Sequence, residues 1–228
     1  MTGQVVLVDD VYWRFEGSSA TMYARSASED RRTRWGTSIS VDPFPAYPHD
    51  VGLVRDVLAS VASAFPIPEP FDPDVFVLTK EVTSRTNAQA GIDFDYDWEK
   101  AEGQTDDERP WFGHIILSGK RIPPHPAMTR YLVAHEYGHV VEEWVSRQRG
   151  FRANGFDLVR EYADMRGLGP DDYDVGGSGG RWHRSIAEIF ANDFRVLRAD
   201  RETEFWPHDV VRPEDAPRAI HEFWQTAA

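Results

Sequence analysis

The chain contains no cysteine among its 228 residues. No disulfide framework can hold the fold together, and this favours a reducing compartment without requiring one. Basic residues are also scarce, since 25 Lys and Arg stand against 38 Asp and Glu, a formal net charge of −13. A nucleic-acid partner is not expected, because phosphate binding requires a basic surface. The acidic surface is compatible with neutral or basic substrates.

Long apolar runs are missing as well. Residues 1–10 have no basic start and no extended apolar segment, so they do not resemble a signal peptide. No stretch approaches the roughly 20 apolar residues that cross a bilayer. We therefore expect a cytoplasmic protein that does not enter a membrane, although secretion by a route without a standard signal is compatible with the sequence. The oligomeric state is left open.

The residues that are present suffice for a core, with 41% hydrophobic and 13% aromatic residues. The length fits one large domain plus a small extension. Residues 1–45 hold short runs rich in Val, Tyr, Trp and Phe, which are typical of strands, and prolines follow from Pro43 onward. We predict a strand-rich N-terminal extension at 1–45, packed on a catalytic domain at 46–228.

The second segment contains both helical and strand patterns. Apolar residues recur at helical spacing over 51–64, and Asp50 is a suitable N-cap. Residues 75–78 read as a buried strand and 92–96 as an exposed one. A further strand is predicted at 111–118, and prolines then precede a long helix.

That long helix carries the central motif, His135-Glu136-Tyr137-Gly138-His139, within an apolar segment. Residues four apart lie on one face of a helix, so His135 and His139 present two imidazoles side by side. Such a pair chelates zinc, and Glu136 is close enough to act on water at the metal. The alternative is a helix that simply carries two buried histidines.

A third ligand is available in Glu188, near the start of a helix predicted over 186–197. Two histidines and one glutamate leave a coordination position open, which is the catalytic rather than the structural arrangement. Asn192 lies one turn later and is a candidate hydrogen-bond partner for a ligand histidine. An ordinary surface carboxylate is the alternative for Glu188, but its apolar neighbours favour an interior position, where an unpaired charge is costly.

The pair of motifs resembles the zincin metallopeptidases that use a glutamate as third ligand. His-Glu-x-Gly-His followed by Glu-x-Phe-Ala-x-x-Phe-Arg is most similar to the catalytic domain of anthrax lethal factor and to the Pro-Pro endopeptidases. The ImmA/IrrE-type peptidases resemble it more distantly, through Glu-x-x-Ala-Asn-x-Phe. The likeness covers roughly the C-terminal half, from Trp111 onward, and the tail 215–223 resembles the terminal helix of the family.

The resemblance implies a zinc ion on His135, His139 and Glu188, with Glu136 as general base. Lethal factor has a tyrosine seven residues before its glutamate ligand, which helps to polarise the substrate carbonyl, whereas this chain has Arg181 there. His183 is therefore our candidate for the group that stabilises the oxyanion. Tyr173 and Arg181 are its rivals, and a structural histidine at the helix start is the alternative.

The expected fold class is α+β, zincin-like, with a small mixed sheet, a central metal-binding helix and a C-terminal helical part. By resemblance, 111–118 is the edge strand above the cleft, where an extended peptide can add to the sheet; a strand that binds nothing is an equal alternative. The expected function is zinc-dependent hydrolysis of peptide or protein substrates. The other hypotheses are a catalytically silent zincin-fold module that binds a protein partner, and a structural zinc protein, for which the ligand set is poorly suited.

Overall fold

The computed structural model describes residues 5–8, 10–16, 19–25, 32–35, 44–69, 71–81, 88–94, 111–149, 156–174, 185–198 and 215–227. Its centre is a four-stranded sheet in the order β1 (Val5–Val8), β6 (Asp74–Leu78), β9 (Trp111–Leu117) and β8 (Ala88–Phe94). The first three strands are parallel, and β8 runs antiparallel to β9. The sheet is therefore small and mixed, as predicted.

Two further sheets lie outside this one. β2 (Asp10–Glu16), β3 (Ser19–Arg25) and β4 (Arg32–Trp35) form an antiparallel sheet, in which β3 is the middle strand. The short strands β5 (Phe44–Pro45) and β7 (Lys80–Glu81) pair with each other. The segment predicted as strand-rich is thus largely composed of strands where the structure describes it.

The first strand does not belong to a separate unit. β1 pairs in parallel with β6, with Val5 opposite Val75, and Val5 is buried in the same hydrophobic cluster as the helices. The predicted boundary at residue 45 therefore cuts across the central sheet. Val5 and Val8 of β1 are buried although they point to opposite faces of the strand, while Leu7 is exposed, so β1 is covered on both faces at these two positions.

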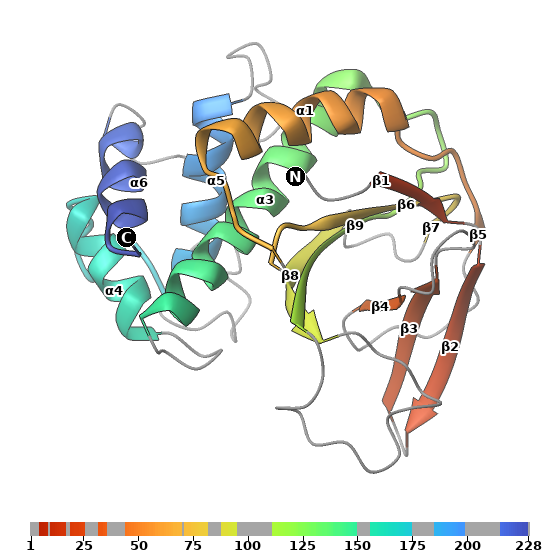
Figure 1. Ribbon diagram of the computed structural model, residues 1–228, viewed down its shortest axis with the longest axis horizontal. Coiled ribbons are helices and arrows are strands. Elements are labelled where there is room, and N and C mark those ends of the chain that lie inside the picture. Colours follow the sequence, from red (N-terminus) through yellow and green to blue (C-terminus); the bar gives the residue numbers. More distant parts are fainter. Residues whose placement is uncertain are drawn as a thin grey trace.

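The helices in the described part of the chain are α1 (Val51–Ala64), α3 (Pro126–Gln148), α4 (Phe156–Met165), α5 (Ile186–Arg198) and α6 (Ala216–Gln225). α3 contacts α1, β8 and β9 on one side and α5 on the other, and α6 packs on α4 and α5. Figure 1 shows α3 running from the sheet into the group formed by α4, α5 and α6. α3 is therefore central, and it carries the metal motif between the sheet and the C-terminal helices.

The helix ends agree with local sequence signals. Asp50 accepts a hydrogen bond from the backbone N–H of Leu53 at 2.9 Å, which caps α1 as predicted. Pro126 opens α3, where its missing N–H leaves no intrahelical bond unmade. None of the helices in the described ranges combines the length and the apolar content needed to cross a bilayer.

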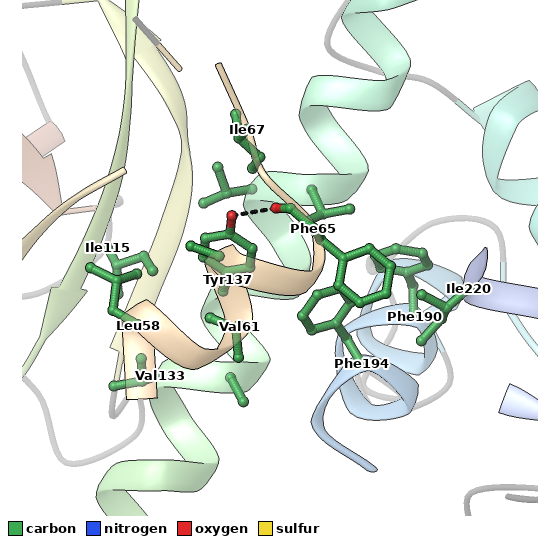
Figure 2. Close-up of a cluster of buried hydrophobic side chains, with 14 of the residues drawn as sticks. Leu58, Val61, Phe65, Ile67, Ile115, Val133, Tyr137, Phe190, Phe194 and Ile220 are labelled. Carbon is green, nitrogen blue, oxygen red and sulfur yellow. Dashed lines mark hydrogen bonds between the residues drawn. The ribbon is translucent and has the colours of Figure 1, made fainter. Parts of the chain in front are cut away.

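Aromatic packing joins the sheet-facing and C-terminal halves of the molecule. Tyr137 of α3 donates its hydroxyl to the carbonyl oxygen of Phe65, at the end of α1, at 2.6 Å (Figure 2). The Phe65 ring lies 4.8 Å from that of Phe194 on α5. Phe190 and Ile220 complete this side of the cluster. One core thus includes all five helices of the described ranges and the central sheet, an arrangement compatible with the α+β class.

One strand prediction is wrong. The strand predicted at 111–118 as the edge of the sheet is β9, which lies between β6 and β8. Its residues from Gly113 to Leu117 are all buried, so the apolar run covers both faces of an interior strand. Gly113 shows how closely the strand is enclosed, because a Cβ there would lie 2.1 Å from the carbonyl oxygen of Phe71. The edge next to β9 is β8.

Candidate metal centre

His135 and His139 lie one turn apart on α3 and face the same way. Their ring centroids are 4.9 Å apart, and the ring planes are at 85° to each other. His135 is 4% exposed, and His139 is the more accessible of the two, with 18% of its side chain exposed. The spacing of four residues therefore places both imidazoles beside one another at the interface between α3 and α5.

Glu188, in the first turn of α5, completes the group. Its Oε2 lies 3.2 Å from Nε2 of His135, and its Oε1 lies 3.5 Å from Nε2 of His139. One ligand atom from each of the three residues lies within 4.8 Å of the others. Two ligands on a tetrahedral zinc ion, each at 2.0–2.1 Å, are about 3.3 Å apart. The three side chains therefore fit a metal ion, and the group could hold one.

A glycine inside the motif allows this convergence. A Cβ on Gly138 would lie 3.0 Å from the Cα of Ala191 and 3.0 Å from the Cβ of Phe194, both on α5. The two helix backbones thus approach closely at the turn that carries the histidines. Without this close contact α5 would stand farther from α3, and Glu188 would be farther from both imidazoles.

Burial and charge act in opposite directions on the ionisable groups of the site. Burial raises the pKa of Glu188, but His139 and His135 outweigh it and lower this pKa to about 2. Burial lowers the pKa of His139, whereas Glu188, Glu142 and Glu136 together raise it well above the usual value. Glu188 is therefore an ionised carboxylate, which is the form that binds a cation.

Glu136 is in a different environment from Glu188. It is 6% exposed, and burial raises its pKa, against the lowering effect of His135 and His139. The charge of Glu188 adds to the increase. A carboxylate with a raised pKa holds a proton more readily than an exposed one, as a general base in catalysis must.

Two further glutamates follow the motif on α3. Oε2 of Glu142 lies 4.0 Å from Nδ1 of His139, so this carboxylate faces the ring nitrogen that is farther from Glu188. Glu143 instead pairs with Arg147 at 3.0 Å. Of the two residues, Glu142 is thus the one placed to orient a ligand histidine.

Asn192, predicted as a partner of a ligand histidine, bonds to another residue. Its Oδ1 accepts a hydrogen bond from the hydroxyl of Tyr131 at 3.2 Å. The Tyr131 ring in turn stacks on His135, with centroids 5.8 Å apart and planes within 11°. The guanidinium carbon of Arg195 lies 4.3 Å from the centre of the same ring. Asn192 therefore reaches the histidine through Tyr131.

Sequence reasoning missed Tyr131 and Arg195, although spacing offered a signal. Tyr131 is four residues before His135 and hence on the same face of α3. Arg195 is seven residues, about two turns, after Glu188 on α5. Burial raises the pKa of the Tyr131 hydroxyl, against the effect of Arg195, so the group stays protonated at neutral pH and can donate.

Of the three residues predicted to stabilise an oxyanion, the structure describes only Tyr173. Tyr173 is partly buried and packs against the hydrophobic core. It adjoins Asp174, which forms a β-bridge with Ser185 immediately before α5. His183 and Arg181 lie outside the described residues.

A buried ion pair joins α5 to Arg166, the residue that follows α4. Nε of Arg166 contacts Oδ2 of Asp193 at 2.5 Å, and the Tyr162 hydroxyl donates to the same oxygen at 2.7 Å. Arg166 is 1% exposed and Asp193 is fully buried. Asp193 is five residues after Glu188, so this pair constrains the rotation of the helix that carries the third ligand.

No protein-family model, curated protein or solved structure matches the chain. The resemblance to zincins consequently rests on the two motifs and on the group that they form in the structure.

Proposed function

We propose that this protein is a zinc-dependent endopeptidase of the zincin type. The observation that carries the proposal is the convergence of His135, His139 and Glu188 next to a buried Glu136 whose pKa is raised. A structural site would have no use for a basic carboxylate beside the ligands. A hydrolytic site needs that group.

Zinc is proposed because of the donor set. Two imidazole nitrogens and one carboxylate, with a position left open, are typical of catalytic zinc. Zinc held in this way supplies Lewis acidity, which polarises a carbonyl group and lowers the pKa of water at the open position. His135, His139 and Glu188 would hold the ion, and Glu142 would orient His139.

Glu136 would move the proton. As the oxygen of water forms its bond to the carbonyl carbon of the peptide, Glu136 takes a proton from that water. It then gives the proton to the amide nitrogen when the C–N bond breaks, which releases an amine and a carboxylic acid. The raised pKa of Glu136 suits both steps, since the same group must accept the proton and release it within one turnover.

A peptide substrate is favoured by the edge of the central sheet. In the described part of the chain β8 pairs only with β9, so its other side is an edge. α3, the helix with both histidines, contacts β8. An extended peptide that adds to this edge would lie along the helix of the metal site. In this proposal β8 takes the peptide-binding role that was expected for the strand at 111–118.

The oxyanion would be stabilised by the metal and by a side-chain donor. His183 is our first candidate for this donor, with Tyr173 and Arg181 as rivals. Alanine at 183 should lower kcat more than it raises KM, because such a donor acts in the transition state. If Tyr173→Phe has this effect and His183→Ala does not, the role passes to Tyr173.

The decisive experiment compares Glu136→Gln with the wild type in zinc content and in cleavage of denatured protein. The amide cannot accept a proton, so turnover should fall by about 10²–10⁴-fold while zinc content is unchanged. Glu143→Gln is the control, because this glutamate lies on the same helix but pairs with Arg147 and should keep full activity. Equal turnover of Glu136→Gln and wild type would rule out the general base. A wild type that binds zinc and cleaves nothing would favour the silent binding module.

A further inference from the structure

A second set of contacts joins α3 and α5 one turn away from the candidate ligands. On α3 it consists of Tyr131, and on α5 of Asn192 and Arg195; we call these three residues the tyrosine layer. Tyr131 precedes His135 by four residues, and Asn192 follows Glu188 by four. The layer therefore stands beside the metal group on the same pair of helix faces.

The first contact of the layer is with a ligand. The rings of Tyr131 and His135 are nearly parallel, with planes within 11° and centroids 5.8 Å apart. Both side chains are almost fully buried, at 9% and 4% exposure. A buried ring lying against the imidazole restricts its rotation, and hence the direction in which Nε2 points.

The second contact crosses to the other helix. The Tyr131 hydroxyl donates to Oδ1 of Asn192 at 3.2 Å, one turn from Glu188. The stack and the hydrogen bond thus run in series from His135 to α5. The two contacts therefore link His135 to α5, the helix that carries Glu188. Nε2 of His135 and Oε2 of Glu188 are 3.2 Å apart in this arrangement.

The third contact holds the tyrosine itself. Arg195 places its guanidinium carbon 4.3 Å from the centre of the Tyr131 ring. Its Nη1 is buried and makes no hydrogen bond among the residues that the structure describes. Contact with the aromatic face is a favourable arrangement for such a cation. Arg195 therefore fixes the ring that lies against His135.

We propose that Tyr131 is a positioning residue for the metal, which holds His135 at the right distance and orientation relative to Glu188. The inference rests on the proposed zinc site, but it concerns metal affinity and not the reaction. Residues that orient metal ligands typically change the affinity by about 10–100-fold when they are substituted.

The test is zinc affinity, measured by competition with a chromophoric chelator, together with the visible spectrum of the Co²⁺-substituted protein. Tyr131→Phe keeps the ring and removes the hydroxyl, so it should weaken zinc binding by about 10-fold. Tyr131→Leu also removes the stack and should weaken it further. The Co²⁺ spectrum should change in both variants, because the direction of the His135 ligand changes.

Tyr137→Phe is the matched control. This tyrosine lies on the same helix and donates a buried hydrogen bond to Phe65 within the hydrophobic cluster (Figure 2). It is two residues from each histidine, and residues two apart do not share a helix face. Its loss should lower the melting temperature and leave zinc affinity and the Co²⁺ spectrum unchanged. A control that lost as much zinc affinity as Tyr131→Phe would show that general destabilisation is responsible, and would overturn the proposal.

Unchanged zinc affinity in both Tyr131 variants would also overturn it. Failure of the proposed hydrolysis looks different, because a wild type that binds zinc without cleaving peptides leaves the comparison of affinities intact. A wild type that binds no zinc would overturn both the metal site and the role of Tyr131.

Discussion

Gly138 of α3 lies directly against Ala191 of α5, so close that a Cβ on the glycine would be 3.0 Å from the alanine Cα. Glycine normally weakens a helix, since it loses more backbone freedom than alanine on folding. Here it stands within the metal motif, where the two helices must approach for Glu188 to meet the histidines. Gly138 therefore lowers the stability of α3 at the turn where a short distance between α3 and α5 is needed to bring Glu188 to the histidines.

Gly138→Ala should therefore weaken metal binding. The added methyl group must displace the backbone at Ala191 and the side chain of Phe194 by a few tenths of an ångström. Overpacking of this kind lowers the free energy of unfolding by about 1–3 kcal/mol, and the better helix propensity of alanine offsets about 1 kcal/mol of that loss. We expect a net loss of about 1 kcal/mol in the free energy of unfolding, measured in urea, together with lower zinc affinity.

Gly52→Ala serves as the control for a methyl group added to a helix outside the α3–α5 contact. Gly52 is an exposed residue of α1, and the atom nearest to an added Cβ is a side-chain oxygen of Asp50 at 3.2 Å. That oxygen caps α1 and must shift by a few tenths of an ångström, so a small loss of stability is compatible with this variant, whereas its zinc affinity should equal that of the wild type. If Gly138→Ala also kept wild-type zinc affinity, the close contact with α5 would not be needed for the site.

Glu188→Ala should lose the metal. The variant keeps only the two imidazoles. Substitution of a residue that merely orients a ligand lowers metal affinity by about 10–100-fold, so removal of a ligand itself should lower it by more than about 100-fold. Elemental analysis of the purified variant and chelator competition measure this. Glu142→Ala is the comparison. The Glu142 carboxylate faces His139 from 4.0 Å, so its removal should lower zinc affinity less than the removal of Glu188. Full zinc occupancy in Glu188→Ala would remove Glu188 from the site.

The features predicted correctly from the sequence are those that depend on local patterns. The cap at Asp50, the helix over 51–64 and the long helix of the metal motif each follow from residues within a few turns of one another. The sequence also predicts the contact between Glu188 and His135, because a carboxylate buried among apolar neighbours requires a charged partner nearby.

The features that were missed depend on contacts between distant segments. An apolar run such as 111–117 is compatible with several positions in a sheet, and only the pairing with β6 and β8 shows that it is interior. The hydrogen bond from the Tyr131 hydroxyl to Asn192 joins residues that are 61 positions apart. No periodicity within either helix specifies which side chains face one another across the interface.

The ion pair of Arg166 and Asp193 should be among the largest single contributions to stability. Arg166→Met leaves Asp193 buried and charged without its main partner, and a change of this kind typically costs about 3–5 kcal/mol. The double variant Arg166→Met/Asp193→Leu should lose less than the sum of the two single variants, because no unpaired charge remains. Urea denaturation of the four proteins gives the coupling energy.

An exposed pair is the control for that cycle. Arg218 and Glu222 form a salt bridge of 2.9 Å on α6, with about half of each side chain accessible. Surface pairs of this type contribute little, so Glu222→Gln, which leaves the hydrogen bond from Arg218 to the Met165 carbonyl in place, should change stability by less than about 1 kcal/mol. Equal losses at the two sites would contradict the interpretation of Arg166 as a buried anchor of α5.

His49 should make stability depend on pH in the acid range. The side chain is 1% exposed, and its Nδ1 lies 2.8 Å from the hydroxyl of Thr129 on α3. Burial, together with the positive charge of Lys120, lowers the pKa of His49 to about 4. In the unfolded chain the pKa is close to 6.5. As pH falls from 6.5 to 4, the unfolded chain therefore binds a proton that the folded chain does not.

The folded state consequently loses stability over that window, and the contribution is fully present above pH 6.5. A difference of about 2.5 in pKa corresponds to about 3 kcal/mol, lost between pH 7 and pH 4. His49→Gln keeps a polar side chain near Thr129 but cannot titrate, so its free energy of unfolding should decline less than that of the wild type across this range. Urea denaturation at pH 7, 6, 5 and 4 measures the difference. Parallel curves for wild type and His49→Gln would show that His49 binds its proton equally well in both states, and would contradict the effect of burial.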